Sequence, residues 1–195
     1  MEKIYPKHSL GVIELNKSTL FLSSILIFGI YHAEVCGKTD VPPSFEEFFT
    51  EGGYKTVEDA LDNFEQHYKQ KPNLPLRVPP ISFTHQFGIF HDLDGDFNDF
   101  FEVKYINDQI PENHYKIYVR SKKYKIEFDD KYVLKVYKLN NGNDALYMEP
   151  NFPFKMLAFE NGNWQYVLHI DNRVDEVTPE ILVQIANSIN YDTEN

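Results

Sequence analysis

The chain has 195 residues, of which 42% are hydrophobic and 25% are charged, with 19 Lys and Arg against 30 Asp and Glu. This length allows one ordinary domain with appendages, or at most two small domains. The apolar content suffices for a packed core and excludes wholesale disorder. The net charge of −11 argues against nucleic-acid binding, which needs a basic field. The single cysteine excludes an internal disulfide framework and any multi-thiolate metal site.

The first 37 residues have the pattern of a signal or membrane-anchor segment. An uncharged stretch, 18–33, follows Lys3, Lys7 and Lys17, and a basic leader before a short apolar run is typical of a secretory signal. Its apolar residues would lie on all sides of a helix and form no single stripe, which disfavours a buried core helix. As a helix it would rise about 24 Å, against about 30 Å for the hydrocarbon core of a bilayer. The lysines ahead of it predict an inside amino terminus and a body on the extracytoplasmic side of the cell membrane.

Cys36 lies where a lipoprotein signal places its acylated cysteine. The preceding residues, 33–35, depart from a lipobox, which has a small residue directly before the cysteine. Three outcomes stay open: lipidation of Cys36, cleavage by a type I signal peptidase, or retention of the segment as an uncleaved anchor.

A tether and a short helical turn are expected over residues 38–55, because prolines stiffen 40–44 and phenylalanines follow at helical spacing. A single α+β domain should cover 56–191, leaving 192–195 as a tail. The domain begins with a helix capped by Thr56 and ending near Lys69. A proline-rich stretch, 71–80, cannot continue that helix.

From Ile81 onward, apolar residues recur at every second position, as strands require. Strands are expected over 81–89, 101–105, 115–119, 124–128, 133–139, 145–148, 155–159 and 166–170. Asn- and Gly-rich turns at 140–143 and 161–163 predict hairpins and therefore antiparallel pairing. A last helix should start with Thr178 as N-cap and Pro179 as its first residue. The fold expected is a curved antiparallel meander with one amphipathic helix before it and one after it, both against its inner face.

The acidic loop 92–99 is the most suggestive cluster for chemistry. Ca²⁺ prefers oxygen ligands, and Asp92, Asp94, Asp96 and Asn98 of this loop offer them. An EF-hand loop starting there would need Gly and Glu where the chain has Phe97 and Val103, so that register fails. An acidic turn between two strands is the alternative interpretation.

Four histidines of the body, at positions 85, 91, 114 and 169, lack the spacing of a zinc-binding pair. His67, five residues after Asp62, is expected on a solvent face without a role. Nucleophile motifs and phosphate loops are absent from the sequence, so no catalytic residue and no cofactor is expected. The tyrosines that crowd the strands suit a cleft or a partner surface, although tyrosine also simply favours strands.

Four segments carry a resemblance: 140–147, 157–162, 164–168 and 178–189. Together they resemble an extracytoplasmic domain of unknown function found in predicted lipoproteins and anti-sigma-factor-like membrane proteins of Gram-positive bacteria, related to the LolA/RseB type of curved half-barrel. The likeness covers about residues 130–190 and implies no catalytic residues.

The function expected is that of a membrane-tethered extracytoplasmic binding or sensor module. Its partner would be a lipid, a peptide or an envelope protein held in a curved-sheet cleft, and not a nucleic acid. The alternative is a hydrolase-like or metal-dependent enzyme that uses loop 92–99 with His85 or His91.

Overall fold

The structure is a computed structural model that describes residues 43–93, 95–149 and 153–189. The predicted signal or anchor segment, with Cys36, and the tail lie outside this range, as does Asp94. Among the helices of the described residues, none has the length and apolar character that a membrane span requires.

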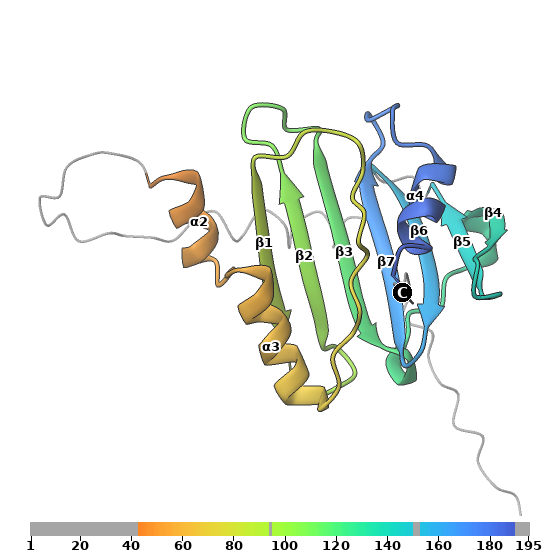
Figure 1. Ribbon diagram of the computed structural model, residues 1–195, viewed down its shortest axis with the longest axis horizontal. Coiled ribbons are helices and arrows are strands. Elements are labelled where there is room, and N and C mark those ends of the chain that lie inside the picture. Colours follow the sequence, from red (N-terminus) through yellow and green to blue (C-terminus); the bar gives the residue numbers. More distant parts are fainter. Residues whose placement is uncertain (1–42, 94, 150–152, 190–195) are drawn as a thin grey trace, which may run out of the picture. The chain divides into compact units, whose positions relative to one another are not determined.

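One curved sheet of seven antiparallel strands forms the body of the molecule (Figure 1). In chain order the strands are β1 (His85–His91), β2 (Phe100–Ile106), β3 (His114–Ser121), β4 (Val133–Lys138), β5 (Asp144–Met148), β6 (Phe154–Asn161) and β7 (Trp164–Asp171). Gly142 and Gly162 adopt positive φ in the predicted turns, with values of 83° and 58°. These observations confirm the α+β class and the antiparallel pairing.

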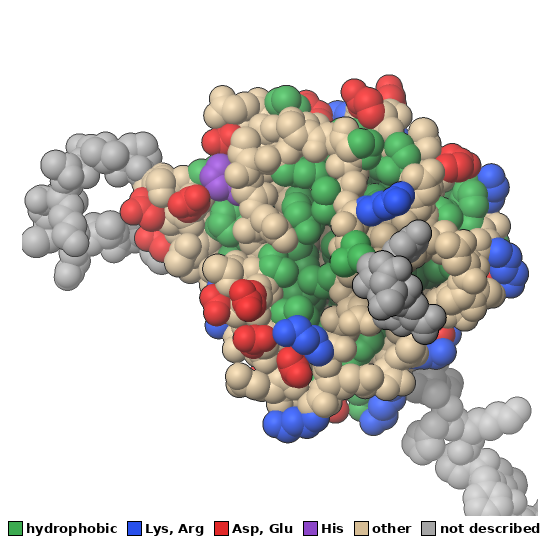
Figure 2. All heavy atoms as spheres, viewed as in Figure 1, with side chains coloured by type: hydrophobic (Ala, Val, Ile, Leu, Met, Phe, Trp, Pro, Cys, Tyr) green, Lys and Arg blue, Asp and Glu red, His purple; other side chains and the backbone are tan. Residues whose placement is uncertain are grey.

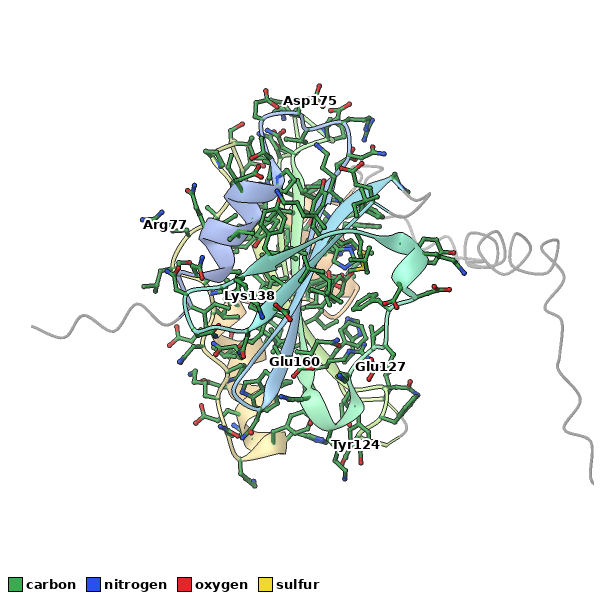
Figure 3. All side chains as sticks on the ribbon, turned by 90° about the vertical axis from the view of Figure 1, so that its right-hand side faces the viewer. Arg77, Tyr124, Glu127, Lys138, Glu160 and Asp175 are labelled. Carbon is green, nitrogen blue, oxygen red and sulfur yellow. The ribbon has the colours of Figure 1, made fainter. Side chains whose placement is uncertain are left out.

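The predicted sequential meander is wrong at one junction. The strands lie in the order β1-β2-β3-β7-β6-β5-β4, so two meanders are joined where β3 pairs with β7. The chain therefore has to cross from the middle of the sheet to its far edge between residues 122 and 132. Figure 3 shows this crossing, with Tyr124 and Glu127, on the opposite side of the sheet from Arg77.

The predicted strand at 124–128 is also wrong. Short 3₁₀ turns occupy Lys122–Tyr124 and Asp130–Tyr132, and the residues between them are irregular. β3 already has β2 and β7 as neighbours, so the crossing segment finds no strand edge there. A side chain replaces the missing strand partner: the N–H of Ile126 donates to Oε1 of Gln165, and Nε2 of Gln165 donates to the carbonyl of Ile126, both at 2.8 Å.

Among the described residues, three helices accompany the sheet: α2 (Phe45–Glu51), α3 (Val57–Tyr68) and α4 (Pro179–Ala186). The Thr56 hydroxyl accepts a hydrogen bond from the N–H of Asp59 and caps α3 as predicted, and Lys69 ends it in a left-handed conformation. Pro179 opens α4 as predicted. Thr178 is its N-cap, also as predicted, although the Thr178 hydroxyl makes no capping hydrogen bond. Helices α3 and α4 lie over one face of the sheet, called the front face below (Figure 1).

The main core lies between the front face and these two helices. Phe64 of α3 is fully buried, and its ring centroid lies 4.9 Å from that of Trp164 and 5.9 Å from that of Phe101. The proline-rich stretch runs up the same face (Figure 1), where the hydroxyl of Tyr166 donates to the carbonyl of Asn73 at 2.9 Å. Figure 2 shows hydrophobic side chains in the middle of this face.

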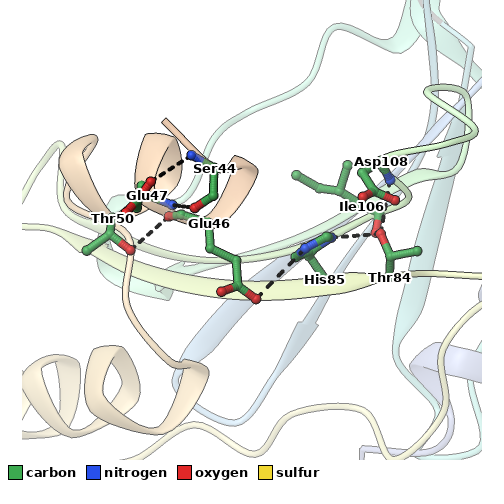
Figure 4. A network of polar contacts seen from close by, with 8 residues as sticks. All are labelled: Ser44, Glu46, Glu47, Thr50, Thr84, His85, Ile106 and Asp108. Carbon is green, nitrogen blue, oxygen red and sulfur yellow. Dashed lines mark hydrogen bonds and ion pairs between the residues drawn. The ribbon is translucent and has the colours of Figure 1, made fainter. Parts of the chain in front are cut away.

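Helix α2 lies beside the first strand (Figure 1). Ser44 and Glu47 form a reciprocal capping box at its start, with N···O distances of 3.2 and 2.7 Å. Glu46 then lies 3.9 Å from Nε2 of His85 (Figure 4). The contact between Glu46 and His85 connects the helix to β1.

Gly88 of β1 is the point of closest approach between the sheet and α3. A Cβ atom there would lie 2.8 Å from Cα of Val57 and 2.9 Å from Cβ of Ala60. Gly88→Ala should therefore force the helix away from the sheet and lower the free energy of unfolding by about 1–3 kcal/mol, the usual cost of overpacking. Urea denaturation measures this change in the free energy of unfolding. Gly52→Ala is the control, since φ there is −73°; equal stability of the two variants would contradict the close approach.

Candidate functional site

The opposite face of the sheet, called the rear face below, is rich in polar side chains. Alternation along the central strands directs them away from the core. They are Glu102, Lys104, His114, Lys116, Tyr118, Arg120, Gln165, His169 and Asp171. The pairing of β2, β3 and β7 places Lys116 between Lys104 and His169. Buried charge on a sheet face is costly unless it is matched, so each group needs a partner.

One carboxylate and one ammonium on this face match each other. Glu102 and Lys104 are 4% and 9% exposed, and their charged atoms lie 3.2 Å apart. The Tyr54 hydroxyl donates to Oε1 of Glu102 at 3.1 Å, and the ammonium of Lys104 lies 4.2 Å from the centroid of the Tyr54 ring. Burial opposes ionisation of Glu102, but Lys116 and Lys104 outweigh it and lower its pKa. The charges of Glu102 and Lys104 therefore neutralise each other.

Two further cations on the rear face form no ion pair with a carboxylate of the described residues. The ammonium of Lys116 donates to the hydroxyl of Tyr118 at 3.2 Å, and the guanidinium of Arg120 lies 5.7 Å from the centroid of the Phe100 ring. Both side chains are half-buried, and burial lowers the pKa of Arg120. The face therefore holds an excess of positive charge, although the protein as a whole carries −11.

The four candidate histidines all lie on the rear face. His85 and His91 belong to β1, His114 begins β3 and His169 lies in β7. Burial, followed by the nearby charge of Lys116, lowers the pKa of both His114 and His169 to about 4. Both rings are consequently neutral near pH 7 and do not add to the positive charge.

A groove runs between the crossing segment and the rear face, and we call it the rear groove. Its larger part has a volume of about 560 Å³ and is lined by Lys116, Tyr118, Glu127, Phe128, Asp129, Tyr132, Met148, Phe154, Met156 and His169. A smaller part of about 260 Å³ shares Tyr118, Phe128, Met156 and His169 with it and adds Phe100, Arg120, Ile126 and Val167. The lining is thus mainly apolar, with the two unmatched cations within it.

The carboxylates at the edge of the rear groove already have partners. Glu127 lies 3.2 Å from the ammonium of Lys125, and Asp129 lies 2.6 Å from that of Lys131. These groups are exposed ion pairs on the crossing segment. They do not neutralise Lys116 or Arg120.

The acidic loop 92–99 lies elsewhere, at the connection between β1 and β2. Asp99 is 1% exposed, whereas Asp92, Asp96 and Asn98 are exposed. Nε2 of His67 lies 3.2 Å from Oδ2 of Asp99 and 3.7 Å from Oδ1 of Asp96. His67 is exposed, as predicted. Nothing in the sequence indicated that it lies next to this loop.

The predicted combination of the loop with His85 or His91 differs from what the structure brings together. His85 contacts Glu46 and Thr84, and the ring of His91 stacks on Phe100 with 4.3 Å between centroids. His67 takes the place next to the loop. The calcium interpretation of Asp92, Asp94, Asp96 and Asn98 stays a prediction, because Asp94 lies outside the described residues.

Comparison with protein-family models, with curated proteins and with solved structures finds no match. The resemblance of residues 130–190 to the lipoprotein domain therefore stays an expectation. The interpretation of the site rests on its geometry.

Proposed function

We propose that this protein is a membrane-tethered extracytoplasmic binding module whose rear groove holds a ligand with an apolar chain and an anionic headgroup. The tether and the compartment rest on the sequence pattern of the first 37 residues. The observation that carries the ligand class is the presence of Lys116 and Arg120, without carboxylate partners, in a mainly apolar groove.

The size and lining of the rear groove support a small ligand. Ligand sites usually have volumes of about 300–1,000 Å³, an apolar lining and a few placed polar groups. The larger part of the groove falls within this range. An acyl chain would cover apolar side chains such as Phe128 and Met156, which border both parts.

The charge of the groove supports an anionic headgroup. A half-buried cation loses hydration, and without a carboxylate at ion-pair distance only part of that cost is recovered. A carboxylate or phosphate would restore that balance through charge-assisted hydrogen bonds. We place the headgroup at Lys116, since this residue lines the larger part and His169, its cross-strand neighbour, is neutral.

Binding of three probes that each carry a ten-carbon chain tests the proposal: decanoate, decanol and decyltrimethylammonium. Isothermal titration calorimetry of the full-length chain should rank decanoate first. Lys116→Met should weaken decanoate binding by about 10–100-fold, since a hydrogen bond to a charged group contributes about 1.5–3 kcal/mol, and should leave decanol binding unchanged.

Two further variants complete this test. Arg120→Met should have the smaller effect, and Lys138→Met, which removes an exposed cation paired with Asp144, should have none. Equal binding of decanoate and decanol, or full binding by both the Lys116 and Arg120 variants, would contradict the proposal. Loss of an unmatched cation should not unfold the protein.

A further inference from the structure

We propose that the protein also binds a divalent transition-metal ion of the Zn²⁺ class through His67, Asp92 and Asp99. The site joins the end of α3 to the connection between β1 and β2. One ligand atom from each residue lies within 4.8 Å of the others. This inference is independent of the rear groove, because it uses none of the groove residues.

Asp99 is the residue that points to a bound cation. It is 1% exposed, and its Oδ1 accepts a hydrogen bond from the N–H of Leu93 at 2.8 Å. Its Oδ2 is buried and has no hydrogen-bond partner among the described residues. A buried carboxylate oxygen without a hydrogen bond is costly, so a further ligand is expected beside His67, which lies 3.2 Å away.

The distance between Asp99 and His67 fits two ligands of one metal ion. Oδ2 of Asp99 and Nε2 of His67 lie 3.2 Å apart without forming a hydrogen bond. Metal–nitrogen and metal–oxygen bonds of about 2.0–2.2 Å in tetrahedral geometry separate two ligand atoms by roughly 3.3 Å. A modest change in the exposed side chain of Asp92 would complete three ligands.

No lysine or arginine of the described residues forms an ion pair with the carboxylates of this site. The ion pairs of Asp96 and Asp99 both go to His67. A metal ion would supply the missing positive charge and require His67 in its neutral form. The competing arrangement is a plain ion pair between a protonated His67 and Asp99, and the experiment below separates the two.

The donor set selects the class of metal. One imidazole nitrogen with two carboxylates suits Zn²⁺ and its neighbours. Ca²⁺ prefers six to eight oxygen ligands, and Mg²⁺ prefers an octahedron with several waters. Because Asp92 is exposed and His67 is partly exposed, a fourth position remains open to water.

Titration with Co²⁺ tests the site, since its visible absorption reports the geometry of its ligands and Zn²⁺ should displace it. The titration uses the full-length chain with the substitution Cys36→Ser, which removes the thiol as a competing ligand. We expect Co²⁺ bands that Zn²⁺ abolishes and that Ca²⁺ or Mg²⁺ at the same concentration leaves intact. Asp99→Asn and His67→Gln should each weaken Co²⁺ binding by at least about 10–100-fold. That is the usual loss when a residue that only orients a metal ligand is replaced.

Asp62→Asn is the matched control, because Asp62 lies on the same helix and pairs with Lys71 at the surface; its Co²⁺ affinity should equal that of the parent. His67→Gln keeps the test valid if Asp99→Asn fails to fold, since His67 is partly exposed. Absence of Co²⁺ bands, Co²⁺ affinities of the His67 and Asp99 variants equal to that of the parent, or displacement of Co²⁺ by Ca²⁺ would overturn the proposal and leave a plain ion pair.

Discussion

Replacing Phe64 with alanine is expected to lower the free energy of unfolding by about 3–5 kcal/mol, the usual cost of removing a buried phenylalanine side chain. Phe64 is fully buried, and its ring contacts those of Phe101 and Trp164 on two different strands. It is the main apolar connection of α3 to the sheet. Equilibrium unfolding in urea, followed by tryptophan fluorescence, measures the loss.

Phe48→Ala provides the matched control, because it removes the same atoms from a side chain that is 63% exposed in α2. Its effect should stay within about 0.5 kcal/mol, as for most surface substitutions. Similar losses in the two variants would mean that Phe64 does not occupy the core between α3 and the sheet.

Acidification should destabilise the protein through His169. Burial, with the charge of Lys116, lowers the pKa of His169 from 6.5 to about 4 in the folded state. Between these values the unfolded chain binds the proton and the folded protein does not, so stability falls as the pH decreases from 6.5 to 4. A difference of this size corresponds to about 3 kcal/mol for this residue.

His169→Phe separates this contribution from that of the carboxylates. Urea midpoints of the parent and the variant should differ in their pH dependence between pH 6.5 and 4, with the parent losing more stability. Parallel pH profiles of the two proteins would show that His169 is protonated equally in both states, and would contradict its burial as a neutral ring beside the groove.

The elements of the fold were predictable because they depend on local patterns. Thr56 and the apolar spacing after it define α3, and the Asn–Gly turns define two hairpins of the sheet. The order of the strands was not predictable, since it depends on the pairing of β3 with β7, which are far apart in the chain. Residues 124–128 alternate as a strand does, but β3, the strand before them, already pairs with β2 and β7.

The sites were predictable only in part, because they also depend on contacts between residues that are far apart in the chain. The acidic loop and four histidines stand out as residue types, but spacing does not show that His67 reaches the loop from α3. The unmatched charge of Lys116 becomes apparent only when the register places it between Lys104 and His169. A sequence lists the charged residues without showing which of them have partners.

The most direct test of the rear groove is NMR of the methionine methyl groups in the full-length chain. The protein has three methionines, and two of them, Met148 and Met156, line the groove. Titration with decanoate should shift both of their signals to saturation and leave that of Met1 unchanged. Saturable binding of decanoate without a shift of either groove methionine would contradict the proposed site.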